Sequence, residues 1–232
     1  MKSPILLTGC ARSGTSLAAG VINTCGAFGG NMSPGNINNR KGMFENSRIR
    51  NEIVKPYFRS LGVDSMGQYP LPEITGMNIP IDWADRVQRV ITEEGYEDGP
   101  WMYKGAKMAL HWPVWNYAFP DAKWIIVRRK TPDIIRSCER TGFMRAFTGK
   151  KNQMAVGALN TNEGWLWWVH QHEERFREMI DAGLNVKIVW PERMVEGNYT
   201  LMKEAVEWAG LEWNHQAVLD FIEPKLWKSR QK

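Results

Sequence analysis

Short apolar runs alternate with longer amphipathic stretches along this chain. The apolar runs predict buried strands at Ile5–Leu7, at Trp101–Lys104, within Phe119–Arg129 and at Val186–Trp190. Apolar residues at helical spacing predict helices over Thr15–Cys25, Ser47–Leu61, Asp82–Glu94, Val114–Phe119, Thr131–Arg140, Asn160–Ala182, Tyr199–Ala209 and Asn214–Ile222. Strands that alternate with helices indicate an α/β fold, with helices on both faces of a central, mainly parallel sheet.

The segments between these elements are rich in glycine, proline and polar residues. Residues 29–44 and 62–81 are predicted to be irregular, and the basic stretch 143–158 is predicted to be a loop over the active face. No repeat, low-complexity segment or linker divides the chain, so we expect a single domain over residues 1–232. The net charge of +5 indicates anionic ligands without choosing among them.

Cysteine usage and hydropathy suggest a cytoplasmic protein. Cys10, Cys25 and Cys138 show neither metal-ligand spacing nor an even-numbered disulfide framework, so reduced thiols are expected. No apolar run approaches the length of a membrane span. Leu6–Cys10 has the look of a lipoprotein cleavage box, but the apolar run Pro4–Leu7 is too short for a signal sequence, which needs about seven apolar residues or more.

A loop bounded by Gly9 and Gly14 follows the first predicted strand and precedes the first predicted helix. This arrangement binds anions, because loop N–H groups point inward and the helix N-terminus adds about half a positive charge. Gly9, Gly14 and Ser16 match the nucleotide-binding pattern G-x-x-x-x-G-K-[ST]. Thr15 occupies the lysine position, and Arg12 supplies a cation within the loop instead. The loop therefore favours a shorter anion than a nucleoside triphosphate, although a strand, turn and helix without a ligand would give the same pattern.

A second candidate anion site lies at the end of another predicted strand. Arg128 and Arg129 end that strand, and Ser137 follows eight residues after Arg129 in the next predicted helix. In parallel α/β sheets, ligands bind at the C-terminal ends of the strands. A guanidinium forms two parallel bonds to a phosphate, and a hydroxyl adds a third. The alternative is a basic strand end that is simply solvated.

Together, these segments resemble the donor site of sulfotransferases that use 3′-phosphoadenosine 5′-phosphosulfate (PAPS). Gly9–Leu17 is similar to the 5′-phosphosulfate loop of that family. Ile125–Ser137 is similar to its 3′-phosphate site, in which an arginine ends a strand and a serine follows eight residues later. Weaker similarity to the family continues at Gly42–Asn46, Lys104–Lys107, Phe119–Lys123 and Pro191–Met194.

One departure from the family pattern leaves open which arginine would bind the 3′-phosphate. Pro132 lies three residues after Arg129, whereas the family usually has this proline two residues after its arginine. Arg128 is therefore an alternative, but the spacing to Ser137 favours Arg129.

The resemblance implies a fold like that of P-loop NTPases, with three α/β/α layers, and an enzyme that moves a sulfuryl group from PAPS to an acceptor hydroxyl or amine. The acceptor would be a carbohydrate or another small molecule, bound near residues 62–100 and 143–160, where the resemblance is weakest. The implied donor-binding residues are Gly9, Ala11, Arg12, Ser13, Gly14, Thr15, Ser16, Arg129 and Ser137.

The implied transfer needs a base and fixed positive charge. Glu45 is the first candidate for the base, and His111 is the rival. Arg12 and the loop amides would hold the sulfuryl oxygens, while Lys104 or Lys107 would stabilise the bridging oxygen. No metal is required, and no His, Cys or Asp cluster has ligand spacing.

Two other functions fit parts of the sequence. A P-loop kinase or NTPase would use the same glycine loop, but the chain lacks the lysine and an obvious strand-ending aspartate for Mg²⁺. A nucleic-acid-binding module would need a continuous basic stripe, whereas the basic residues here concentrate at two strand ends. We therefore expect a dinucleotide-sized ligand and no nucleic-acid partner.

Overall fold

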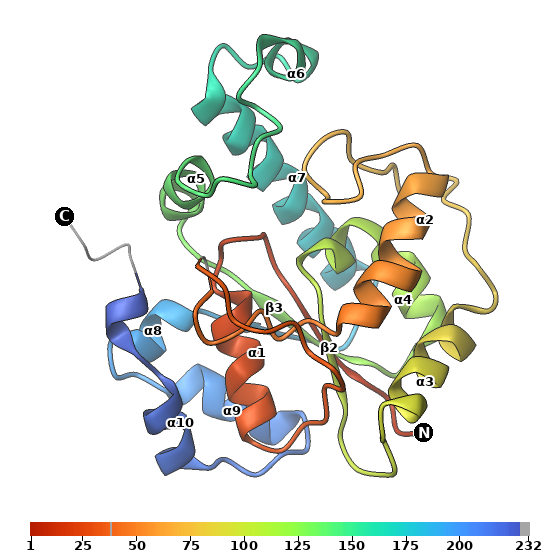
Figure 1. Ribbon diagram of the computed structural model, residues 1–232, viewed down its shortest axis with the longest axis vertical. Helices are drawn as coiled ribbons and strands as arrows, with labels where there is room; N and C mark the ends of the chain where they lie inside the picture. The colour runs from red at the N-terminus through yellow and green to blue at the C-terminus, as the bar shows by residue number, and fades with distance from the viewer. Residues whose placement is uncertain (38, 228–232) are drawn as a thin grey trace.

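A parallel sheet lies at the centre of the computed structural model, which describes residues 1–37 and 39–227 (Figure 1). Its four strands have the order β2-β1-β3-β4. They are β1 (Ile5–Thr8), β2 (Met102–Lys104), β3 (Lys123–Val127) and β4 (Val186–Val189). All pairings are parallel, and Ile5 lies opposite both Met102 and Lys123. The C-terminal ends of all these strands therefore meet at one edge, as expected for a ligand-binding α/β sheet.

Helices cover both faces of the sheet. On one face, Leu6, Trp124 and Ile126 pack with η1 (Ile49–Val54), α2 (Lys55–Ser60), α3 (Trp83–Glu93), η2 (Ala106–His111), α4 (Trp112–Ala118) and the end of α7 (Thr161–Asp181). On the other, Ile5, Leu7 and Ile125 pack with α1 (Thr15–Thr24), α8 (Pro191–Val195), α9 (Thr200–Trp208) and α10 (His215–Phe221). This alternation along β1 follows the two-residue period of a strand. The predicted three-layer α/β/α fold is confirmed.

A third apolar cluster lies beyond the sheet edge, where α5 (Thr131–Glu139) packs against the first half of α7. Trp165 and Trp168 of α7 are buried here with Cys10, which follows β1. Fully burying a large apolar side chain contributes about 1.5–3 kcal/mol, so this cluster fixes α5 firmly beside the glycine loop. The buried tryptophans of the molecule are core residues rather than a row of exposed stacking platforms.

The helix predicted over Ser47–Leu61 has an unexpected first half. Residues Ile49–Val54 form a π-helix, followed by the α-helical α2. Pro56 has no N–H to donate, and the carbonyl of Glu52 accepts from the guanidinium of Arg86 instead, at 3.1 Å. The proline therefore changes the hydrogen-bond pattern before it without ending the helix.

The predicted loop 143–158 is partly wrong, because Lys150–Ala155 form helix α6 beside α7 (Figure 1). The inward position of α6 is the polar Gln153, whose amide donates to the carbonyl of Phe147 at 2.8 Å. A helix anchored by one polar residue shows no apolar period. η3 (Pro224–Leu226) ends the described chain near α10. No helix within the described residues is both long and apolar enough to cross a membrane.

Candidate functional site

The glycine loop turns between β1 and α1 at the C-terminal edge of the sheet. A Cβ atom added to Gly9 would lie 2.4 Å from the carbonyl oxygen of Val127 on β3, so only glycine fits there. Arg12 and Gly14 both have left-handed backbones, with φ of 72° and 97°. Gly14 is the N-cap of α1 and offers no side chain to the first turn of the helix. The loop thus leaves helix N–H groups for a ligand.

Arg12 connects the two predicted anion-binding segments. Its Nε donates to the Ser137 hydroxyl on α5 at 3.0 Å, and its carbonyl accepts from Nη1 of Arg129 at 2.8 Å. The glycine loop, the end of β3 and α5 therefore meet at one point. Arg128 points elsewhere: it forms an ion pair with Glu173 of α7 and lies over the Trp190 ring. Of the two arginines, Arg129 is the one that contacts the glycine loop.

The junction around Arg12 has polar atoms without partners. The Ser13 hydroxyl and the Arg129 Nε are buried, and neither has a hydrogen-bond partner among the described residues. An unpaired buried polar group costs about 1–3 kcal/mol. Burial lowers the pKa of both Arg12 and Arg129, so each guanidinium lacks full compensation for its lost hydration. Each is a kind of donor that a bound oxyanion would satisfy.

Trp227, just after η3, covers part of this junction. Its indole ring lies 4.4 Å from the guanidinium carbon of Arg129. A Cβ atom added to Gly14 would come within 2.8 Å of the same ring. The C-terminal segment therefore packs directly on the helix cap and on the candidate 3′-phosphate arginine.

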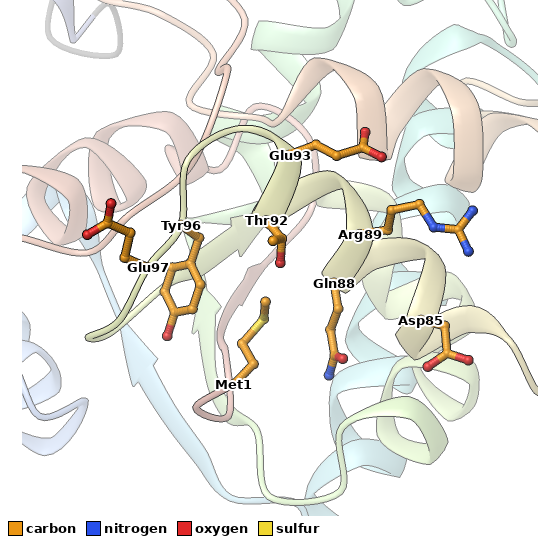
Figure 2. Close-up of a pocket in the computed structure, with 8 residues that line it drawn as sticks. All are labelled: Met1, Asp85, Gln88, Arg89, Thr92, Glu93, Tyr96 and Glu97. Atoms are coloured by element: carbon orange, nitrogen blue, oxygen red, sulfur yellow. The ribbon is translucent and has the colours of Figure 1, made fainter.

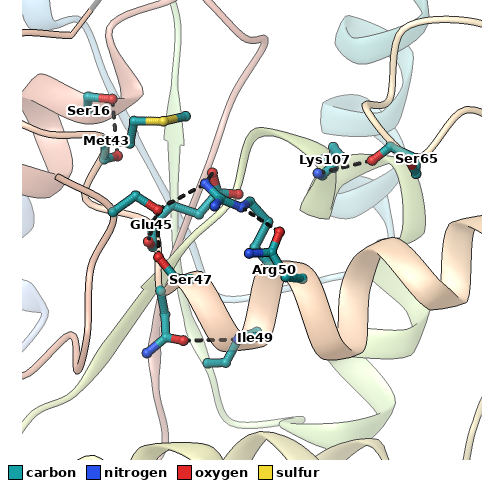
Figure 3. Close-up of polar contacts among 11 residues, drawn as sticks. Ser16, Met43, Glu45, Ser47, Ile49, Arg50, Ser65 and Lys107 are labelled. Atoms are coloured by element: carbon teal, nitrogen blue, oxygen red, sulfur yellow. Dashed lines mark hydrogen bonds and ion pairs between the residues drawn. The ribbon is translucent and has the colours of Figure 1, made fainter. Parts of the chain in front are cut away.

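A second group of polar residues lies next to the loop, around Glu45 (Figure 3). The Ser16 hydroxyl at the start of α1 donates to the carbonyl of Met43 at 3.2 Å, which ties the helix start to the segment that carries Glu45. The Glu45 carboxylate is 7% exposed and lies 3.7 Å from Nη1 of Arg50 on the π-helix. This ion pair orients the Glu45 carboxylate, a group of the type that serves as a general base.

Two lysines from β2 and η2 face the same region. Lys104 ends β2 and is 5% exposed, yet its ammonium forms no hydrogen bond or ion pair with any residue that the structure describes. Burial lowers the pKa of Lys104, with further effects from the charges of Glu45, Arg50 and Arg12. Lys107 on η2 donates to the carbonyl of Ser65 at 3.2 Å, and burial lowers its pKa to about 8 (Figure 3). Both lysines are therefore close enough to Glu45 to interact electrostatically.

His111 is a core residue and not a candidate base, which corrects the sequence-based rival to Glu45. The ring is fully buried, its Nδ1 bonds the Lys107 carbonyl, and its Nε2 accepts from Nε1 of Trp115 at 2.8 Å. Burial lowers the pKa of His111 to about 3. Both nitrogens are occupied inside an aromatic cluster with Tyr57, Phe58 and Trp83, so neither reaches a substrate.

Other features of the described chain do not add to this site. A surface hollow beside α3, lined by Met1, Asp85, Gln88, Arg89, Thr92, Glu93, Tyr96 and Glu97, shares no residue with the predicted set (Figure 2). Among the described residues, no group of three or more His, Cys, Asp or Glu side chains could hold a metal ion.

Sequence reasoning missed three contributors to the site. Arg50 pairs with Glu45, and Lys55 is close enough to interact with the charge of Glu45. Trp227 reaches Arg129 from the far end of the chain, and no local pattern signals that contact. The one sequence feature that could have indicated Arg50 is its position, five residues after the candidate base Glu45.

Comparison with known proteins identifies the fold. No family model and no curated protein matches the sequence. Sulfotransferase STF9 from Mycobacterium avium is structurally similar, with a TM-score of 0.50 at 15% identity over 99% of this chain and 68% of that chain. Sulfotransferase STF1 from Mycobacterium tuberculosis aligns over 99% of this chain and 76% of its own, with a TM-score of 0.49 at 12% identity. The chain therefore has the sulfotransferase-type fold that its two anion-site motifs resemble.

Proposed function

We propose that this protein is a sulfotransferase that moves a sulfuryl group from PAPS to an acceptor hydroxyl or amine of a carbohydrate or another small molecule. The observation that carries the proposal is the junction at Arg12, which bonds Ser137 through its side chain and Arg129 through its carbonyl. Two candidate anion-binding segments that are far apart in sequence meet at this junction, and the fold is of the sulfotransferase type. A single ligand with anionic groups at both ends suits this arrangement.

The donor would be held by its two charged ends. Arg129 and Ser137 would bind the 3′-phosphate, with the unpaired Arg129 Nε as one donor. The backbone amides of Gly14 and Thr15 and the side chain of Arg12 would hold the 5′-phosphosulfate, where fixed dipoles stabilise developing charge without reorganisation. The loop residues Gly9, Ala11, Ser13 and Ser16 complete this set.

The acceptor would react at the side of the loop that faces Glu45. PAPS supplies an activated sulfuryl group: the acceptor oxygen bonds to sulfur as the bond from sulfur to the phosphate oxygen breaks. Glu45, oriented by its ion pair with Arg50, would take the acceptor proton. Lys104, whose ammonium has no acceptor among the described residues, would neutralise charge on the departing oxygen.

Calorimetric titration tests the donor site directly. Adenosine 3′,5′-bisphosphate, the product left from PAPS, is titrated beside ATP·Mg²⁺ into the wild type, Arg129→Ala and Arg128→Ala. We expect the bisphosphate to bind the wild type and Arg128→Ala, and to lose at least tenfold in affinity to Arg129→Ala, since bonds to a charged group contribute about 1.5–3 kcal/mol. Arg128 is the matched control, because it is the adjacent arginine but pairs with Glu173.

Two results would reject this function. Absence of bisphosphate binding to the wild type would remove the donor. Tight binding of ATP·Mg²⁺ in its place would assign the loop to a P-loop kinase or NTPase, despite the threonine at the lysine position.

A further inference from the structure

Four cations surround the single carboxylate of Glu45. Arg50 lies 3.7 Å from it, and Lys55, Lys104 and Lys107 are close enough to interact with its charge. They come from different parts of the fold: Arg50 from the π-helix, Lys55 from α2, Lys104 from β2 and Lys107 from η2. We call Lys55 and Lys107 the lysine pair.

The π-helix is what adds Lys55 to this group. The backbone N–H of Lys55 donates to the carbonyl of Arg50, five residues earlier. In an α-helix, residues five apart point about 140° away from each other, whereas the wider π turn brings them closer to the same face. The charge of Arg50 accordingly acts on Lys55, and the charge of Lys55 acts on Lys107.

These cations have few partners within the protein. Arg50 is engaged by Glu45 and by the Ser33 hydroxyl at 2.9 Å. Lys107, at 9% exposed, donates only to the Ser65 carbonyl, and Lys55 forms no hydrogen bond or ion pair within the described chain. Buried charges of one sign are costly unless an opposite charge compensates them. Lys104 and Lys107 are buried, while Arg50 and Lys55 are half-buried, and one carboxylate does not neutralise four cations, so added anionic charge would stabilise this region.

The proposed donor accounts for only part of this excess. Its sulfuryl oxygens would be held by Arg12 and the loop amides, with Lys104 at the bridging oxygen. Lys107 lies next to Ser65, and in Figure 3 Glu45 stands between Lys107 and Ser16 of the glycine loop's helix. Ser65 belongs to a segment that Gln68 ties to residues 143–146, through 2.8 Å bonds to Phe143 and Arg145. Lys107 therefore lies beside the segments expected to bind the acceptor, and Lys55 is close enough to Lys107 for their charges to interact.

We propose that the acceptor carries an oxyanion, a carboxylate, sulfate or phosphate, and that Lys55 and Lys107 bind it while the reacting hydroxyl faces Glu45. This inference rests on the proposed function, because it takes Arg12 and Lys104 to be occupied by the donor. It narrows the acceptor to the acidic members of its class, such as a uronic acid or a sulfated or phosphorylated sugar. A neutral alcohol would leave both ammonium groups without a counterion.

The first test measures anion binding without turnover. Inorganic sulfate is titrated at constant ionic strength into protein saturated with adenosine 3′,5′-bisphosphate. The variants are Lys55→Met/Lys107→Met and the control Lys187→Met/Lys203→Met, which removes the same charge from exposed positions on β4 and α9. We expect the sulfate dissociation constant to rise at least tenfold in the first variant and to stay unchanged in the control. Equal sulfate binding by the wild type and by both variants would overturn the proposal.

The second test compares acceptors that differ only in charge. Sulfuryl transfer from PAPS to glucuronate and to its neutral amide, glucuronamide, is measured, and the ratio of their kcat/KM values is expected to exceed tenfold and to collapse in Lys55→Met/Lys107→Met. Equal or faster transfer to glucuronamide would contradict the proposal. Failure of the proposed function is distinguishable, because it appears as absent bisphosphate binding, which depends on Arg129 and not on the lysine pair. In that case sulfate is titrated without the nucleotide, and the same variants decide whether the lysine pair binds an oxyanion.

Discussion

Replacing Lys107 by methionine should make the protein more stable at neutral pH and should change how its stability depends on pH. Lys107 is 9% exposed. Burial lowers its pKa from 10.5 to about 8, with further lowering by the charges of Lys55, Arg50 and Lys104, partly offset by Glu45. Methionine keeps the length of the side chain and removes the buried charge. It also removes the bond to the Ser65 carbonyl, a loss that does not depend on pH.

The direction of the effect follows from proton linkage. Below about pH 8, Lys107 is charged in both the folded and the unfolded chain. The whole cost of burying this charge then lowers the free energy of unfolding. Between about pH 8 and 10.5 the unfolded chain binds more protons, so wild-type stability rises with pH through this window. The pKa shift corresponds to a free energy on the order of 3 kcal/mol.

Urea unfolding of wild type and Lys107→Met at about pH 7 and about pH 10 measures this difference. We expect the stability advantage of the variant over the wild type to decrease by on the order of 2–3 kcal/mol from about pH 7 to about pH 10, because the wild type gains stability over this range. The control Lys203→Met, which changes an exposed lysine on α9, should track the wild type. Parallel pH profiles for Lys107→Met and wild type would refute the inference that this lysine is buried and uncompensated.

Three further substitutions test the loop, the base and the aromatic core. Gly9→Ala should lower the free energy of unfolding by about 2 kcal/mol or more in thermal or urea unfolding, because its Cβ would lie 2.4 Å from the Val127 carbonyl; unchanged stability would contradict the described loop. Glu45→Gln should lower kcat about 100-fold or more while bisphosphate affinity stays the same, and unchanged kcat would exclude Glu45 as the base. His111→Phe should cost about 1–3 kcal/mol by leaving the Trp115 Nε1 unpaired, yet retain kcat per folded molecule; selective loss of kcat would return His111 to the reaction.

Local sequence patterns predicted the features that depend on local chemistry. Strands β1 and β3 are buried on both faces, so they read as continuous apolar runs, and the glycine loop has a spacing that only a few folds use. The sequence also places Arg129 at a strand end and Ser137 in the next helix, where both are predicted to bind one phosphate. The structure adds that Arg12 forms hydrogen bonds with both Arg129 and Ser137. Sequence spacing could not predict the bond to Ser137, because it joins the loop after β1 to α5 across 125 residues of sequence.

The parts that could not be predicted depend on tertiary structure. His111 follows Lys104 closely, so it was a reasonable base, but the turns of η2 and α4 point its ring into the aromatic core. The π-helix before Pro56 brings Lys55 closer to the face of Arg50, and helical periodicity alone places these residues on different faces. Trp227 covers Gly14 only because the C-terminal segment returns to the first helix. The Trp227 contact joins segments far apart in the sequence, and the other two cases depend on how a local turn orients side chains that periodicity places elsewhere.

The most direct test of a single donor site is whether Arg129 recognises a 3′-phosphate. Adenosine 3′,5′-bisphosphate and adenosine 5′-monophosphate, which differ only in that group, are titrated into the wild type and Arg129→Ala. We predict that the wild type prefers the bisphosphate at least tenfold and that the preference falls to about one in Arg129→Ala, while affinity for the monophosphate changes little. A wild type that binds both nucleotides equally, or a preference that survives the loss of Arg129, would contradict the assignment of one donor site spanning the glycine loop and the end of β3.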